Sequence, residues 1–231
     1  RRGSHATEAY LHNGNMLLDR LFGARLHVLE AHEIREERMA ARAEALRAKG
    51  RQPYCIPVGG SCGLGNLGYA VCAEEILNQA SAAGLKFEAV VTATGSGGTQ
   101  GGLVAGMHLL GGPPVIGVAV EGTRAEQETL TAHQAADTLR LLGHNHADTA
   151  ADVTVMDEFV GPGYARPTDS MREALSLAAR FEGLVLDPVY TGKAFAGFIA
   201  LARSGRYGKD QSLLFVHTGG APGLFGYPEN F

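Results

Sequence analysis

The chain has 231 residues, of which 45% are hydrophobic and 19% are charged, and its formal net charge is −4 at pH 7. No apolar run approaches the roughly 20 residues that a membrane span needs, and the basic residues are scattered among acidic ones, which argues against a nucleic-acid surface. The cysteines lack CxxC spacing and favour a reducing compartment, so we predict a cytoplasmic globular protein that binds neither membranes nor nucleic acid.

The chain starts without an initiator methionine and without the pattern of a signal peptide. Because helical spacing of apolar residues begins almost at once, we expect the chain to start inside a domain. The periodicities predict, in chain order, helix 10–22, strand 25–30, helix 33–49, strand 54–58, helix 69–83, strand 87–92, helix 101–110, strand 115–120, helix 126–142 and strand 151–157. Apolar strands that alternate with helices indicate a three-layer α/β fold with a mostly parallel sheet.

Four glycine-rich segments stand where strands end: 59–68, 94–102, 187–193 and 217–223. In parallel sheets, ligands bind beyond the carboxyl ends of the strands. In the second segment, Gly97 and Gly98 let backbone N–H groups approach a ligand, and Thr99 begins a helix whose N-terminus favours an anion. A phosphate fits this pattern, although a tight strand-to-helix turn explains the same glycines.

Two named phosphate motifs can be compared with the chain. A P-loop ends in Gly-Lys followed by Ser or Thr, whereas Gly98 is followed by Thr99 and Gln100, which excludes this motif. The segment "GLGNLG", residues 63–68, matches the dinucleotide fingerprint and lies between a predicted strand and a predicted helix. Glu88, the acid at the expected distance, stands at the wrong end of its strand to bind a ribose. NAD binding therefore stays the lesser alternative.

Five longer blocks, the first two of which contain the segments just described, occur in this order: "IPVGGSCGLGNLGY", "ATGSGGTQGGL", "GPGYARPT", "FEGLVLDPVYTGKA" and "LLFVHTGGAPGLFGY". Together they resemble the D-cysteine desulfhydrase and 1-aminocyclopropane-1-carboxylate (ACC) deaminase family, over nearly the whole chain from Thr7 onward. The resemblance implies an enzyme that uses pyridoxal phosphate and has the tryptophan synthase β-subunit type of fold, called fold type II. It also implies a homodimer and a small amino-acid substrate.

The family has an N-terminal part before the matched region, so the resemblance implies that this chain is N-terminally incomplete. Residues 1–50 then correspond to the remainder of a smaller α/β domain, and residues 51–231 to the larger domain that binds pyridoxal phosphate. The family lysine that binds the cofactor covalently lies in a "GNKxRK" block, and a "QSNH" block follows it; neither block is in this chain. The chain has Lys49, Lys86, Lys193 and Lys209, and of these only Lys193 is predicted at the carboxyl end of a strand.

The resemblance also assigns site residues. The positions that hold the phosphate of the cofactor are matched by Ser96, Gly97, Gly98 and Thr99. Thr218 matches a residue beside the pyridine nitrogen, and Thr191 a second position that contacts the cofactor. Tyr164 and Tyr190 match active-site tyrosines, whose phenols can bind a carboxylate or move a proton. Without the motifs, an ordinary interface role would be the simpler interpretation of both tyrosines.

Two of these positions separate the reactions of the family. Deaminases that open the cyclopropane ring carry Glu after the "DPVY" tyrosine and Leu between His and Gly-Gly, where this chain has Thr191 and Thr218. A neutral hydroxyl leaves the pyridine ring less electron-withdrawing than an acid does, which suits elimination of a readily departing thiolate. We therefore predict a carbon–sulfur lyase that converts D-cysteine to pyruvate, hydrogen sulfide and ammonia.

Several alternatives stay open. The L-cysteate sulfo-lyase branch is similar in all five blocks, but its sulfonate substrate would need a cation, and in the matched loops only Arg166 stands out. An ACC deaminase-like enzyme is a second alternative. A catalytically inert fragment that binds a phosphate ligand is a third, because the lysine block is absent. His144 and His146 lack a third ligand, so we predict no metal site.

Overall fold

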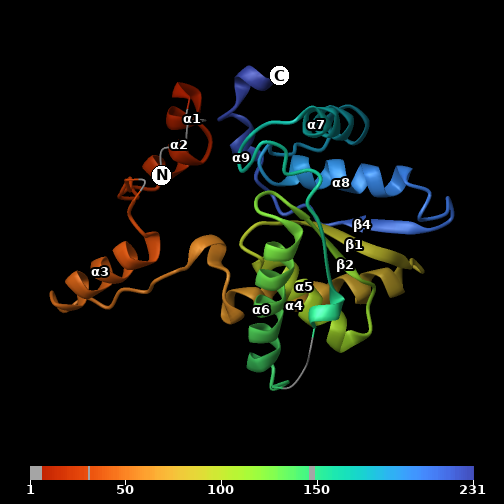
Figure 1. Ribbon diagram of the computed structural model, residues 1–231, viewed down its shortest axis with the longest axis horizontal. Coiled ribbons are helices and arrows are strands. Elements are labelled where there is room, and N and C mark those ends of the chain that lie inside the picture. The colour runs from red at the N-terminus through yellow and green to blue at the C-terminus, as the bar shows by residue number, and fades with distance from the viewer. Residues whose placement is uncertain (1–6, 31, 146–148) are drawn as a thin grey trace.

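The computed structural model describes residues 7–30, 32–145 and 149–231 (Figure 1). At its centre is a sheet of four parallel strands, β1 (Phe87–Thr94), β2 (Val115–Ala119), β3 (Val153–Met156) and β4 (Ser212–Phe215). The strand order is β3-β2-β1-β4, and in this register Val90 of β1 lies opposite Val115 on one side and Leu214 on the other. The predicted parallel sheet is confirmed, and its inner strand β1 is the one that leads into the glycine-rich loop.

Helices cover both faces of the sheet (Figure 1). One face is covered by α4 (Gly63–Ala82), α5 (Gly98–Leu110) and α6 (Arg124–Leu141), and the other by α8 (Thr191–Arg203) with α7 (Asp169–Glu182) against it. The predicted three-layer α/β fold is therefore confirmed.

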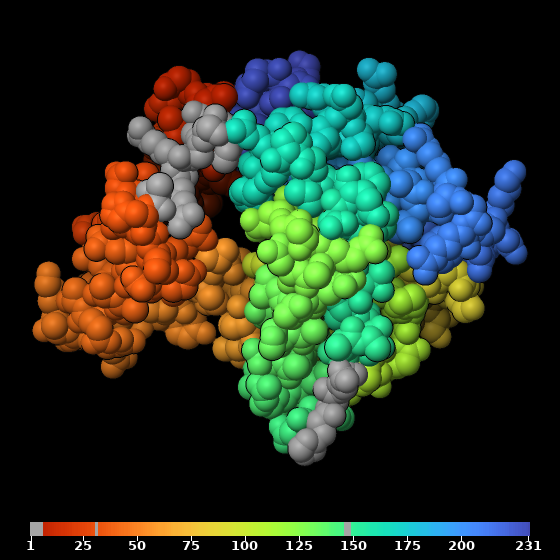
Figure 2. All heavy atoms as spheres, viewed as in Figure 1, coloured from red at the N-terminus to blue at the C-terminus, as the bar shows by residue number. Residues whose placement is uncertain are grey.

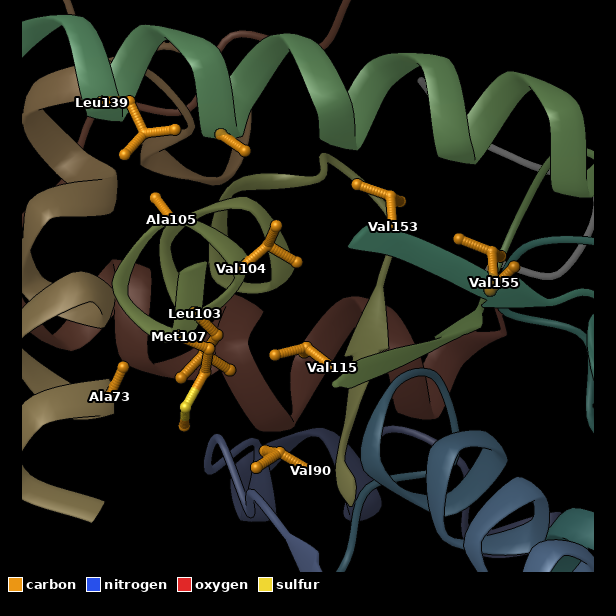
Figure 3. Packing of buried hydrophobic residues seen from close by; sticks show 12 residues of the cluster. Ala73, Val90, Leu103, Val104, Ala105, Met107, Val115, Leu139, Val153 and Val155 are labelled. Atoms are coloured by element: carbon orange, nitrogen blue, oxygen red, sulfur yellow. The ribbon is translucent and has the colours of Figure 1, made fainter. Parts of the chain in front are cut away.

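The hydrophobic core has one cluster on each face of the sheet. Figure 3 shows the first, in which Leu103 and Val104 of α5 pack against Val90 and Val115 of the sheet. On the opposite face, Ala194 of α8 belongs to a second cluster with residues of β1 and β2. Because successive side chains of a strand point to opposite faces, a strand that feeds both clusters must be apolar throughout.

The N-terminal region has helices but, within residues 7–30 and 32–50, no strand. Its helices are α1 (Glu8–His12), α2 (Gly14–Leu21) and α3 (Arg35–Arg47). The predicted strand 25–30 is wrong, and so is 54–58, because neither segment finds a neighbouring strand to pair with in the described chain. Figure 2 shows that the residues around α3, coloured orange, project to one side of the body that holds the sheet.

The remaining helices are short. They are α9 (Ala221–Leu224) and the 3-10 turns η1 (Val58–Gly60), η2 (Ala150–Asp152) and η3 (Pro228–Asn230). The described residues include no helix that is long and apolar enough to cross a membrane.

The segment "GLGNLG" is not a ligand loop, because residues 63–68 form the first turns of α4. A Cβ atom on Gly63 would lie 3.0 Å from the carbonyl oxygen of Asp137 in α6, and one on Gly65 would collide with the carbonyl of Gly60. These glycines therefore allow close packing of α4. No strand precedes them at 54–58, so the dinucleotide interpretation is wrong.

Candidate functional site

A cavity of about 430 Å³ lies at the carboxyl ends of β1, β2 and β4. It brings together most of the predicted site residues, namely Ser96, Gly97, Gly98, Thr99, Tyr164, Tyr190 and Thr218. Other residues that line it include Arg35, Gly59, Tyr69, Thr94 and Glu121. Thr191 is the one predicted site residue outside this set.

The glycine-rich loop presents the N-terminus of α5 to the cavity. Gly97 precedes the helix with a φ of +77°, a left-handed conformation that glycine adopts readily, and no side chain caps the helix. The N–H groups of the first turn, at Gly98 and Thr99, are therefore available to a ligand. Because the positive end of the helix dipole lies at the same place, this part of the cavity is suited to an anion.

A second turn, from the glycine-rich segment 59–68, packs on this loop through Ser61, a residue that was not predicted to belong to the site. The hydroxyl of Ser61 is hydrogen bonded to that of Ser96 over 2.7 Å. A Cβ atom on Gly98 would collide with the Ser61 hydroxyl and lie 2.6 Å from the side-chain oxygen of Asn66. Gly98 thus permits α4 and its preceding turn to approach α5, and Ser61 orients Ser96 at the edge of the anion site.

Thr94, the last residue of β1, places a hydroxyl without a partner beside the cavity. Its side chain is 2% exposed, and its Oγ1 makes no hydrogen bond in the structure. A buried hydroxyl without a hydrogen bond is costly. This oxygen has almost no accessible surface, so a ligand in the cavity does not reach it unless the surrounding residues move.

Two tyrosines meet at the other side of the cavity. Tyr164 lies in the loop between β3 and α7, and Tyr190 immediately precedes α8. Their hydroxyls are hydrogen bonded to each other, and their rings are in edge contact with centroids 5.9 Å apart. Burial is the main cause that raises the pKa of both phenols. Both therefore keep their protons at neutral pH. One hydroxyl donates to the other, so the pair presents one free O–H to a ligand.

Asp187 fixes the backbone that carries Tyr190, a role that was not predicted from the sequence. Its buried carboxylate accepts hydrogen bonds, each 2.8 Å long, from the backbone N–H groups of Val189, Tyr190 and Thr191. The hydroxyl of Thr191 donates to the same carboxylate over 2.7 Å. Thr191 is thus turned toward Asp187, at the start of α8, and away from the residues that line the cavity.

Lys193 is a buried cation near the site, but its amine faces neither the cavity nor a carboxylate group. The side chain is 0% exposed, and its Nζ donates to the backbone carbonyls of Val160 (2.7 Å) and Gly163 (2.9 Å). Burial lowers the pKa of this amine to about 8.

This lowered pKa predicts a pH dependence of stability. At pH values between the lowered pKa of about 8 and the usual pKa of 10.5, Lys193 holds its proton in the unfolded chain and has lost it in the folded chain. The free energy of unfolding should therefore rise with pH in this window, by about 1 to 2 kcal/mol between pH 8 and pH 9.5 relative to Lys193→Met. Urea denaturation followed by circular dichroism would measure both proteins, and a difference that stays constant with pH would contradict the expectation.

The histidines give no metal site within the described residues. No group of three or more potential ligands occurs there. His144 is described, whereas His146 lies outside the described residues.

With this geometry established, the chain can be compared with known proteins. A family model described as "Pyridoxal-phosphate dependent enzyme" matches residues 5–219. D-cysteine desulfhydrases of Salmonella paratyphi C (strain RKS4594) and Salmonella typhi are 42% and 41% identical to it, over 95% of this chain and 66% of each relative. The crystal structure of an ACC deaminase homologue superposes with a TM-score of 0.83 at 33% identity, again over 95% of this chain and 66% of the other. The chain thus spans 66% of the length of these relatives.

Proposed function

Because the chain belongs to the family of pyridoxal-phosphate dependent enzymes, we propose that it serves the breakdown of D-cysteine to pyruvate, hydrogen sulfide and ammonia. The family predicted from the five sequence blocks is confirmed. The parallel sheet with helices on both faces is the fold type II that was expected for this family. The identity to D-cysteine desulfhydrases over 95% of the chain carries the proposal of this substrate.

The residues of the cavity fit the phosphate end of the cofactor. The uncapped N-terminus of α5 offers the N–H groups of Gly98 and Thr99 to an anion, and Ser96 adds a hydroxyl. Lys193 is hydrogen bonded to two backbone carbonyls and does not line the cavity. These observations support reversible binding of the phosphate group by this chain.

A carboxylate introduced into the first turn of α5 tests this binding. Thr99→Asp should weaken the affinity for pyridoxal phosphate about 100-fold, because like charges brought together cost several kcal/mol. The same aspartate favours the helix dipole, so the melting temperature should not fall. Equilibrium dialysis would measure the affinity, with the nearly isosteric, neutral Thr99→Asn as the control. Equal affinities of the two variants would place the phosphate elsewhere.

The chemistry that pyridoxal phosphate supplies when bound is withdrawal of electrons from the α-carbon of an amino acid, so that a group on the β-carbon can leave. We assign the substrate end of the cavity to Tyr164 and Tyr190, which line it together. Because their raised pKa values keep the phenols protonated, the hydrogen-bonded pair would offer its one free O–H to the carboxylate of the substrate or to the departing sulfur. Thr218 lines the same cavity and would place a neutral hydroxyl beside the ring of the cofactor.

The substrate is tested by assaying the protein, supplied with pyridoxal phosphate, on D-cysteine, L-cysteate and 1-aminocyclopropane-1-carboxylate in turn. With D-cysteine we expect sulfide and pyruvate in equal amounts, and no turnover of the cyclopropane substrate. Borohydride treatment followed by intact mass measurement would show whether the assayed protein binds the cofactor covalently. A protein that binds pyridoxal phosphate but releases no product would support the inert alternative.

One observation favours L-cysteate as a second candidate substrate. Arg35, the first residue of α3, lines the cavity that contains the tyrosines. A guanidinium group there could pair with a sulfonate, which D-cysteine lacks. Sulfite release from L-cysteate that is lost in Arg35→Gln would favour this substrate over D-cysteine.

We further propose that the protein is a cytoplasmic homodimer. The three cysteines are free, which agrees with a reducing compartment. An apolar cleft of about 670 Å³, partly lined by the exposed side chains of Leu184, Val185, Phe225 and Phe231, supports an interface with another copy. The assignment of residues 1–50 to a smaller domain and 51–231 to a larger one is part of the same proposal.

A further inference from the structure

The loop that carries Tyr164 has an unusual backbone. It spans residues 157–168, between β3 and α7, and contains positive φ angles at Gly161, Gly163 and Ala165. Ala165 is the one non-glycine residue with a positive φ in the described ranges, and this conformation is unfavourable for alanine. Something outside the loop must therefore hold the conformation, and Tyr164 lies between two of these residues.

The amine of Lys193 contacts this loop from beneath. It donates one hydrogen bond to the carbonyl of Val160 (2.7 Å) and another to that of Gly163 (2.9 Å), directly before Tyr164. Two backbone hydrogen bonds within the loop lie near this point, from the N–H of Val160 to the carbonyl of Asp157 (3.3 Å) and from the N–H of Arg166 to the carbonyl of Gly163 (3.2 Å). The two bonds from Lys193 are thus shorter than these two backbone hydrogen bonds.

The burial of Lys193 is poorly explained by stability alone. The side chain is 0% exposed, and both acceptors of its amine are uncharged backbone carbonyls. A cation without a buried counter-charge is costly, and an apolar side chain of similar length would fill the same space more favourably. We therefore attribute the presence of the amine to the two backbone carbonyls that it holds in place.

The position of Lys193 in α8 connects the loop to the second tyrosine. Tyr190 precedes the first residue of α8, and Lys193 follows within the first helical turn. The same helix end thus carries one tyrosine and anchors the loop that carries the other. Their hydroxyls meet across this junction.

We propose that Lys193 is a positioning residue that holds Tyr164 against Tyr190 by fixing the carbonyls of Val160 and Gly163. The importance of this contact for catalysis rests on the proposed function, whereas the positioning itself does not. Lys193 acts through the loop and touches neither substrate nor cofactor.

The test uses the full chain labelled with 3-fluorotyrosine. Of its seven tyrosines, the ¹⁹F resonances of Tyr164 and Tyr190 are assigned with the two Tyr→Phe variants. Lys193→Met removes the donors and retains an unbranched side chain, and Lys209→Met, at an exposed position, is the control. We expect Lys193→Met to shift the resonances of Tyr164 and Tyr190 alone, and amide exchange in residues 157–168 to accelerate about 10-fold.

Unchanged tyrosine resonances and unchanged loop exchange in a folded Lys193→Met protein would overturn the proposal. If this variant does not fold, Lys193→Leu, which also removes the donors, is measured in its place. A shift of the Tyr164 and Tyr190 resonances in that variant supports the clamp, and unchanged resonances overturn it.

These readouts need neither cofactor nor turnover. In a protein that turns over D-cysteine, Lys193→Met should also lower kcat about 10-fold and leave the affinity for pyridoxal phosphate within twofold. If neither protein acts on D-cysteine, the proposed function fails, while the resonances still decide the role of Lys193.

Discussion

Replacing Asp187 by asparagine is expected to lower the free energy of unfolding by about 3 kcal/mol, because buried hydrogen-bond donors would lose a charged acceptor. The carboxylate is 2% exposed and accepts three backbone N–H groups as well as the hydroxyl of Thr191. An asparagine has one oxygen, so in either orientation its NH₂ group would face donors. Urea denaturation followed by circular dichroism would measure the loss.

Asp169→Asn is the matched control for this prediction. Asp169 is the first residue of α7, and its fully exposed side chain forms an ion pair with Arg172 (2.7 Å). Since exposed ion pairs and helix-dipole contacts each contribute about 1 kcal/mol or less, this variant should be only slightly destabilised. Similar losses in the two variants would mean that the buried hydrogen bonds of Asp187 do not stabilise the start of α8.

Gly102→Val should have a comparable effect through packing between helices. A Cβ atom on Gly102 of α5 would collide with the backbone carbonyl of Asn66 in α4 and lie 2.7 Å from Cβ of Tyr69. The contact involves backbone and a Cβ atom, so the helices themselves must move apart. We expect a loss of about 3 kcal/mol in the free energy of unfolding, at the upper end for overpacked cores.

Gly68→Ala provides the opposite expectation on the neighbouring helix. Gly68 lies within α4, and a Cβ atom there would meet nothing within 4 Å. Alanine is the better helix former, so this variant should be stabilised by about 0.5 to 1 kcal/mol. An unchanged stability in Gly102→Val would contradict the assignment of Gly102 to close helix packing, and a loss of stability in Gly68→Ala would contradict the open space at Gly68.

The fold could be predicted where a segment carries its own signal. The apolar runs at 87–92 and 115–120 become strands β1 and β2, because their side chains feed hydrophobic clusters on both faces of the sheet. Residues 25–30 have a similar local pattern but no strand beside them, so they form none. Gly63 and Gly65, which in the sequence resemble a loop motif, are required inside a helix by the close approach of other chain segments. Pairing and packing of this kind depend on distant residues, which local sequence does not report.

The same distinction applies to the candidate site. The glycine-rich loop was predicted as one unit because Ser96 to Thr99 are contiguous in the sequence and lie together at the cavity. Ser61 belongs to the predicted glycine-rich segment 59–68, but its contact with Ser96 could not be predicted because it joins residues 35 positions apart. Lys193 was noted only as a lysine near a strand end, since its carbonyl partners, 30 and 33 residues away, carry no side-chain signal. Hydrogen bonds to distant backbone atoms are recorded in the structure alone.

The strand order also affects how the chain tolerates truncation. β1, which leads into the anion-binding loop, is flanked on one side by β2 and on the other by β4, the last strand in the described chain. A polypeptide that stops before Ser212, through a premature stop codon or proteolysis, would leave one edge of β1 unpaired and open to aggregation. Both edges of β1 are paired only after the ribosome has released β4. We therefore expect shortened chains to bind the ligand poorly at the loop that follows β1.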